Sequence, residues 1–423
     1  MTTAVSLEKL RAWWAHRQGL DGSLDGASPH DVLARTGWAR SVGGCGPYLG
    51  LFARAGLDRE AVDKAVANLE VHELPSARGC TYVVPRQDFA LGLAAGSGAP
   101  DGEIAAAAKH LGVTREEIDR LSDRIVAALD SAGEPLDPAG IKRAVGEAVR
   151  NLGEAGKKRG LTTTLPLALG LLQARGRIRR VPVNGRLDQQ RFGYVPWSPS
   201  PLTDAEPDRG AAHAELARRY FGWAGPASLK HFRWFSGLTA AAAKQAVEPL
   251  DLRPIEGTEL LLPPDQVAAF EKFTVPRAAC YALVAWIDGI HLLHRDPGRL
   301  LDPGDAARQS PAAKPGRTLG DESDPPCSII VDRGRVVGLW EYDPDTEEIV
   351  YQAFVTPTPA LRKAVSATRN YVRDQLGDAR MSSLDSPKSR APRIAALRAG
   401  QPLVHCGPLP ADRRVPDDSR AAE

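Results

Sequence analysis

The sequence is poor in cysteine and methionine, and it contains no long apolar run. Its 423 residues include five cysteines and two methionines. The cysteines are scattered, odd in number and form no CxxC pair, so neither a disulfide framework nor a zinc site is indicated. No stretch approaches the roughly 18 apolar residues of a membrane-spanning helix, and the N-terminus lacks the apolar core of a signal peptide. We therefore predict a cytoplasmic protein that has no membrane partner.

Several enzyme motifs are also missing. There is no GxGxxG after a strand pattern, no GxxxxGK[ST] and no GxSxG, so nucleotide hydrolysis and esterase chemistry have no support. None of the nine histidines belongs to an HExxH motif. His291 and His294, near Asp288 and Asp296, come nearest to a metal cluster, and we expect a structural role for them. We predict no metal and no cofactor.

The positive charge of the chain is concentrated in one segment. The net charge is only +2, which argues against a wholly electrostatic nucleic-acid binder. Residues 157–191, however, contain nine Lys or Arg residues and a single acidic residue, Asp188. Residues 164–174 read as an apolar helix, and residues 178–196 read as two strands around a Gly-containing tip. A helix followed by a basic hairpin is typical of a winged helix that faces DNA.

We predict that this segment contacts double-stranded DNA. Long cationic side chains displace counterions from phosphates, and hydroxyls and free amides at a helix N-terminus suit phosphate oxygens. The alternative is a solvated surface hairpin. Arg78, at the tip of an earlier predicted hairpin, is either a second DNA contact or an exposed neighbour of a turn glycine. The predicted DNA-binding residues are Arg78, Lys157, Lys158, Arg159, Thr162, Thr163, Thr164, Arg177, Arg179, Arg180 and Arg186.

The order helix, short helix, turn, helix and hairpin recurs along the chain. The predicted fold class is α+β, with three tandem winged-helix domains followed by a β-rich C-terminal region that contains a long helix. The domains are predicted at residues 5–90, 114–200 and 210–265, with the C-terminal α+β region at 277–380 and a largely disordered tail at 381–423. A Pro-rich loop is expected at 303–326.

Aromatic side chains stand at helical spacing in two places. Aromatic rings can stack on bases, but at this spacing they more often belong to the core. We therefore expect a core role for Trp13, Trp14, Trp223, Trp234 and Phe235.

Four stretches of the chain match a known group of proteins. They are LPSARGCTYVV at 74–84, LGLLQARGRI at 169–178, AGPASLKHFRWFSGL at 224–238 and VDRGRVVGLW at 331–340. Through them the chain resembles the winged-helix DNA-binding superfamily that includes the AlkZ-like, crosslink-repair DNA glycosylases. The resemblance implies tandem winged helices, a β-rich C-terminal part and a role in DNA repair.

The chain departs from that family at its catalytic signature. The family carries Gln-x-Gln or Gln-x-Asp after the second helix of the first domain, where a polar side chain would position water. The corresponding segment here, RSVGGCGPY at 40–48, contains no Gln, Asp or Glu. The catalytic residues are therefore unknown from the sequence. Cys45 or Tyr48 could do other work, but we favour a loop that only joins two helices.

Three functions fit these observations. The first is a DNA glycosylase-like protein of DNA repair or lesion recognition, acting as a monomer on duplex DNA. The second is a non-catalytic, regulatory DNA binder on the same scaffold. The third is a small-molecule site in the C-terminal region, with the winged helices as framework.

Overall fold

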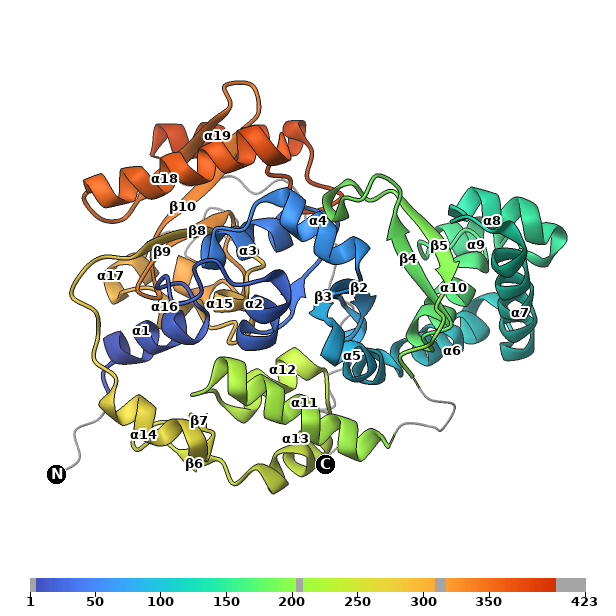
Figure 1. The fold of residues 1–423 in the computed structure, drawn as a ribbon, viewed down its shortest axis with the longest axis horizontal. Coiled ribbons are helices and arrows are strands. Elements are labelled where there is room, and N and C mark those ends of the chain that lie inside the picture. The colour runs from blue at the N-terminus through green and yellow to red at the C-terminus, as the bar shows by residue number, and fades with distance from the viewer. Residues whose placement is uncertain (1–4, 203–207, 309–316, 401–423) are drawn as a thin grey trace.

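The first part of the chain is a group of four helices and a small sheet (Figure 1). The computed structural model describes residues 5–202, 208–308 and 317–400. Ser28 and Asp58 cap two of the helices by accepting backbone N–H groups. The elements are α1 (Leu7–Arg17), α2 (Pro29–Thr36), β1 (Ala39–Arg40), α3 (Gly46–Ala55), α4 (Arg59–Ala67), β2 (Val71–Pro75) and β3 (Thr81–Pro85). The sheet has the order β1-β3-β2 and is antiparallel.

The second part is mostly helical and ends in the basic hairpin, β4 and β5. Thr114 and Asp137 cap its helices, and Pro138 occupies the first position of α8. The strands pair from Ile178 opposite Pro196 to Pro182 opposite Phe192. The elements are α5 (Phe89–Gly96), α6 (Ala99–Leu111), α7 (Arg115–Ala132), α8 (Pro138–Val145), α9 (Gly153–Lys157), α10 (Leu165–Ala174), β4 (Ile178–Pro182) and β5 (Phe192–Pro196).

The third part is compact, and its hairpin is short. Two strands of two residues each follow three helices. The elements are α11 (Arg209–Ala224), α12 (Leu229–Ser236), α13 (Ala240–Val247), β6 (Arg253–Pro254), β7 (Leu261–Leu262) and α14 (Pro264–Lys272). Helices followed by a strand pair thus occur three times in the described chain, as the sequence predicts.

The C-terminal part is built on a four-stranded antiparallel sheet of order β11-β10-β9-β8. This agrees with the β-rich region and the long helix that the sequence predicts there. The elements are β8 (Tyr281–Val284), α15 (Gly289–Leu292), α16 (Pro297–Leu300), α17 (Pro303–Ala306), β9 (Ser328–Asp332), β10 (Arg335–Asp343), β11 (Glu348–Ala353), α18 (Pro359–Tyr371), a π-helical turn (Val372–Leu376) and α19 (Pro387–Ala399). The prediction of a Pro-rich loop at 303–326 is wrong at its start, where residues 303–306 form α17, and residues 319–321 form a 3-10 turn. Residues 309–316 lie outside the described residues.

Helix α19 corrects the prediction of a largely disordered tail from residue 381. Ser386 caps this helix, and Ile394 and Leu397 are buried on it. Arg393 donates to the buried carboxylate of Glu341 at 2.6 Å and to Asp385 at 2.8 Å. The Arg-rich composition suggested an unfolded segment, but these cations pair with acids of the sheet and its neighbouring turn. The rest of the predicted tail, 401–423, lies outside the described residues.

The buried residues form four clusters, and three of them join parts that are distant in sequence. The first joins α2–α4 to the C-terminal sheet and to residues 371–381. The second joins α1 to the other face of that sheet, and the third joins β2 and β3 to α11–α13. The fourth lies within residues 104–178. The segment before the basic hairpin therefore has a core of its own, and the remaining parts share theirs.

Most of the aromatic side chains expected in the core, and His294, are buried in this packing. Trp13, Trp14, Trp223 and Phe235 are buried, which confirms a core role, whereas Trp234 is half-buried. The His294 Nε2–H donates to the Ala224 carbonyl at 2.8 Å, a structural role. Within the described ranges, no group of three His, Cys, Asp or Glu side chains has metal-site geometry. The same ranges contain no helix that is both long enough and apolar enough to cross a bilayer.

Candidate nucleic-acid interface

The basic hairpin lies beside the first sheet, with strand β4 near β2 (Figure 1). Arg180 of β4 forms an ion pair with Glu73 of β2, with Nη2 2.8 Å from Oε2. The Arg180 guanidinium also lies 4.7 Å from the Phe192 ring centroid, on the neighbouring strand. One of the predicted DNA contacts is therefore engaged across the junction between the first and second parts of the chain.

Arg186 is engaged within the protein as well. Its Nε and Nη2 donate to the two carboxylate oxygens of Asp188 at 3.0 and 2.6 Å, and Nη2 also donates to the Leu376 carbonyl at 2.9 Å. The bond to Asp188 raises the pKa of Arg186. The single acidic residue of the basic segment thus neutralises one of its cations. We leave Arg186 out of the proposed DNA contacts.

The cations that remain available belong to the segment after α9 and to the start of β4. Lys157, Lys158, Arg159 and Arg177 are exposed, and Lys157 lies 3.6 Å from the exposed carboxylate of Glu154. Arg179 is half-buried, and burial lowers its pKa. Lys158, Arg159, Arg177 and Arg179 have no ion-pair partner among the residues that the structure describes. These side chains can reach phosphates without breaking an internal contact.

The three threonines predicted to contact DNA also differ in their exposure. Thr162 is exposed and Thr163 is half-buried. Thr164 is fully buried, and its hydroxyl accepts the Arg150 N–H at 3.1 Å. It stands at the N-cap position of α10 but makes no capping bond there. We leave Thr164 out of the proposed interface because its oxygen is used inside the protein.

Arg78 stands at the turn between β2 and β3, at the φ of +59° that the turn requires. Its guanidinium lies 4.3 Å from the Trp234 ring centroid, and that of Arg295 lies 4.7 Å from the same centroid. Both guanidinium groups thus contact the half-buried ring of Trp234. Arg78 is therefore packed against the third part of the chain, and its role in binding DNA stays a prediction.

The loop at 40–48 and the tip of the basic hairpin are in contact. The Gln190 amide donates to the Val42 carbonyl at 3.4 Å, and the Leu187 N–H donates to the Tyr48 hydroxyl at 3.0 Å. A Cβ on Gly43, where φ is +76°, would lie 1.6 Å from the Gln190 side chain. The segment that corresponds to the expected catalytic signature therefore lies directly against the basic hairpin.

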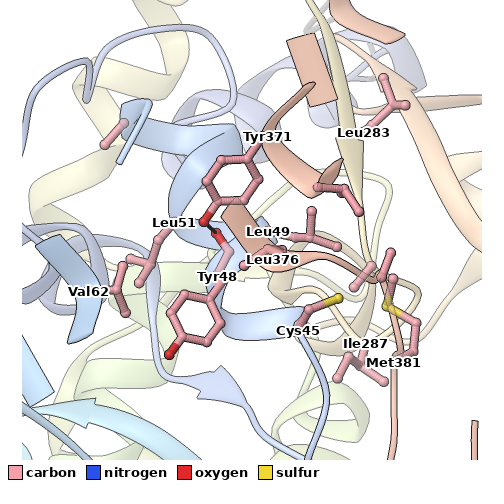
Figure 2. Packing of buried hydrophobic residues seen from close by; sticks show 14 of the residues in the cluster. Cys45, Tyr48, Leu49, Leu51, Val62, Leu283, Ile287, Tyr371, Leu376 and Met381 are labelled. Carbon is pink, nitrogen blue, oxygen red and sulfur yellow. Dashed lines mark hydrogen bonds between the residues drawn. The ribbon is translucent and has the colours of Figure 1, made fainter. Parts of the chain in front are cut away.

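Cys45 and Tyr48 are not available as nucleophiles. Burial raises the pKa of the Cys45 thiol, so the thiol form is favoured. Burial also raises the pKa of Tyr48, whose hydroxyl donates to Asp63 at 2.5 Å. Figure 2 shows both side chains in the apolar packing that includes Leu49 and Met381. This packing supports the interpretation of the loop as a joint between helices.

A cavity of about 420 Å³ opens beside Cys45, between the hairpin tip and the segment after α18. Both acids of its lining are paired, Asp188 with Arg186 and Asp378 with Arg390. Arg191 and Arg380 have no ion-pair partner among the described residues, so the lining carries net positive charge. Arg380 donates to the Asp188 carbonyl at 2.8 Å. The cavity lining consists of Cys45, Arg186, Asp188, Gln189, Arg191, Leu376, Asp378 and Arg380.

A polar pair next to the loop was not predicted from the sequence. Ser41, directly after β1, donates its hydroxyl to Oε1 of Glu73 on β2. Both side chains are buried, with Glu73 only 5% exposed. An acidic residue inside the predicted strand at 71–75 was the available signal. Its partners, however, come from β1 and β4, and the sequence does not show that these strands meet.

Comparisons with known proteins agree with this architecture. A family model described as DNA glycosylase AlkZ-like matches residues 45–381. An interstrand DNA cross-link repair glycosylase of Streptomyces sahachiroi is 25% identical, covering 87% of this chain and 99% of that protein. The solved structure of the DNA glycosylase AlkZ of the same organism aligns with a TM-score of 0.65 at 20% identity, covering 90% and 99% of the two chains. The matched residues begin just after the Ser41 region, so the family model does not extend over β1.

Proposed function

Because this chain belongs to the AlkZ-like family of DNA glycosylases, we propose that it is a DNA-repair glycosylase that removes damaged bases from duplex DNA. The reaction would hydrolyse the N-glycosidic bond between a modified base and its deoxyribose. The relative from Streptomyces sahachiroi is named for interstrand cross-link repair, so cross-linked and alkylated duplexes are the substrates to test first.

The contact between the basic hairpin and the loop at 40–48 is the observation that carries this proposal. A glycosylase must hold the backbone within reach of the sugar that it attacks. Gln190 and Leu187 of the hairpin bond to the loop, and Arg180 pairs with Glu73 next to it. The hairpin that follows the exposed cation Arg177 is therefore joined to the loop at 40–48, where polar groups could act at a sugar.

We further propose that the three helix-and-hairpin units are winged helices and that the second holds the DNA. Its exposed cations, Lys157, Lys158, Arg159 and Arg177, would contact phosphates. The other two units would support it, since the first and third share a core around β2 and β3. We propose that the protein binds as a monomer.

A non-catalytic DNA binder is the second candidate. It is favoured by the loop itself, in which Cys45 and Tyr48 are buried and no Gln, Asp or Glu is present. A protein of this kind would bind duplex DNA with strong salt dependence but would leave glycosidic bonds intact.

Base release separates the two candidates. Duplex DNA methylated at purines, and a second duplex with an interstrand alkyl cross-link, would be incubated with excess protein. Freed base would be measured by chromatography and abasic sites by alkaline cleavage. Release of base supports the glycosylase. Tight binding without release from either duplex would favour the regulatory binder.

A further inference from the structure

We propose that Glu73 is the carboxylate that activates water in this chain, in place of the missing Gln-x-Gln or Gln-x-Asp. The proposal rests on the proposed glycosylase function and names the residue that would carry it. Glu73 lies outside the segment where the family's signature is expected, and it reaches that segment across the sheet.

The register of the first sheet brings Glu73 to the strand of the expected signature. Glu73 on β2 pairs with Val83 on β3, and Val83 pairs with Ala39 on β1. Directly paired residues point to the same face of a sheet, and so do residues two apart on one strand. Ser41 follows β1, and its N–H bonds to the Thr81 carbonyl at 3.0 Å. Ala39, Ser41 and Glu73 therefore share one face.

The two carboxylate oxygens of Glu73 have different partners. Oε1 accepts the Ser41 hydroxyl, which fixes the orientation of the carboxylate. Oε2 is buried and accepts no hydrogen bond among the described residues, although Arg180 Nη2 is 2.8 Å away as an ion-pair partner. Buried carboxylate oxygens usually accept at least one well-directed hydrogen bond. Among the described residues, the only partner of Oε2 is therefore the Arg180 guanidinium, and Oε2 could accept a proton from an attacking water once that guanidinium turns away.

The chemistry balances with this single carboxylate. The C1′–N bond breaks, and its electron pair leaves with the damaged base, so positive charge develops on the sugar. The water oxygen forms the new bond to C1′, and its proton passes to Oε2 of Glu73 and then to solvent. The negative charge of the carboxylate also stabilises the developing cation. Neither step needs an oxidant or a metal.

Movement of Arg180 would make the buried carboxylate of Glu73 accessible. Its side chain is 20% exposed and is the part of the ion pair nearest to solvent. A DNA phosphate competes for the same guanidinium, because arginine binds phosphate and carboxylate with similar geometry. When Arg180 turns to the backbone, Oε2 is released toward the sugar. The ion pair would thus keep Glu73 occupied until DNA is bound.

Four variants test the proposal under single-turnover conditions on the alkylated duplex. Glu73→Gln keeps the size of the side chain and the bond from Ser41 but removes the proton acceptor. We expect its base-release rate to fall by at least about 100-fold, with duplex affinity within about threefold of wild type. Glu117→Gln is the matched control, since it removes the carboxylate of another Glu–Arg pair, with Arg150 at 2.8 Å, and should leave the rate unchanged. If Glu73→Gln unfolds, Glu73→Gln/Arg180→Gln removes both charges and is compared with Arg180→Gln.

The outcomes distinguish this proposal from the proposed function. Release by wild type but not by Glu73→Gln, with unchanged binding by a variant that is still folded at the assay temperature, supports both. Equal release by wild type and Glu73→Gln overturns the assignment of Glu73 and leaves the glycosylase intact. A parallel loss of DNA binding and release in Glu73→Gln would make Glu73 a structural residue and also overturn the assignment. No release by wild type from either duplex overturns the proposed function itself.

Discussion

Gly44 lies against the backbone of Met381. A Cβ placed on Gly44 would come within 2.3 Å of the Met381 carbonyl carbon and 2.4 Å of the Arg380 oxygen. The neighbouring Cys45 N–H donates to that Arg380 oxygen at 2.8 Å, and the Ser383 N–H donates to the Val42 carbonyl at 3.1 Å. The loop beside the basic hairpin is therefore held in place by the segment that leads to α19.

Gly44→Ala should destabilise the protein. The added methyl group meets main-chain atoms, which cannot move aside as a flexible side chain can. We therefore expect overpacking to lower the free energy of unfolding by about 1–3 kcal/mol. Gly102→Ala, in α6 with open space around it, is the control and should be neutral or slightly stabilising. Urea denaturation measures both. Equal stability of the two variants would contradict the close packing of the loop.

Asp288→Asn should be strongly destabilising. Asp288 and Arg54 form a bidentate ion pair at 2.7 and 2.8 Å, and each side chain is only 5% exposed. Asparagine preserves the N-cap of α15 but leaves the arginine charge unpaired, at a cost of about 3–5 kcal/mol.

The control for this variant is the exposed pair of Asp251 and Arg253. Asp251→Asn should change the free energy of unfolding by less than about 1 kcal/mol, because both side chains of that pair are more than half exposed. Chemical denaturation of both variants checks the contrast. A small decrease for Asp288→Asn would mean that this pair is not held as the structure shows.

His294 should make the protein sensitive to acid. Burial lowers its pKa to about 3, whereas a histidine in the unfolded chain has a pKa of about 6.5. The unfolded state therefore binds the proton first, and stability falls as the pH drops from about 6.5 toward the folded value. Between pH 7 and pH 5, protonation of this one histidine in the unfolded state lowers the free energy of unfolding by about 2 kcal/mol.

His294→Gln should remove that part of the pH dependence. For each protein we take the difference in the free energy of unfolding between pH 7 and pH 5. A loss of stability that is the same at both pH values does not affect this difference. We expect a smaller change for the variant than for wild type. The same change in both proteins would show that His294 is protonated in the folded state or lies elsewhere.

Much of the fold can be predicted from the sequence, because its elements have strong local signals. Ser28, Asp58, Thr114 and Asp137 each precede a helical pattern and each caps a helix. The basic hairpin can be predicted because a Gly-containing tip separates two short stretches that read as strands. The helix α19 is not predictable in this way, because its Pro- and Arg-rich composition resembles disorder and its partner Glu341 is more than 40 residues away in sequence.

The candidate site is less predictable, because it depends on contacts between distant segments. A count of charges cannot distinguish Arg177, which is exposed, from Arg186, whose charge is paired with Asp188. Thr164 fits a phosphate-binding position in sequence but is buried in the structure. Glu73 becomes a candidate only when the register of β1, β3 and β2 is known.

The salt dependence of duplex DNA binding tests the central claim, that the exposed cations before and within the basic hairpin hold the DNA. Affinity would be measured by fluorescence anisotropy across a range of salt concentrations. We compare wild type with a variant in which Lys157, Lys158, Arg159 and Arg177 are alanine, and with Arg253→Ala as an exposed control. We predict that the slope of log affinity against log salt falls by up to about 0.9 for each phosphate that the variant no longer neutralises, with no change for the control. A fourfold variant that binds with the affinity and slope of wild type would contradict the account.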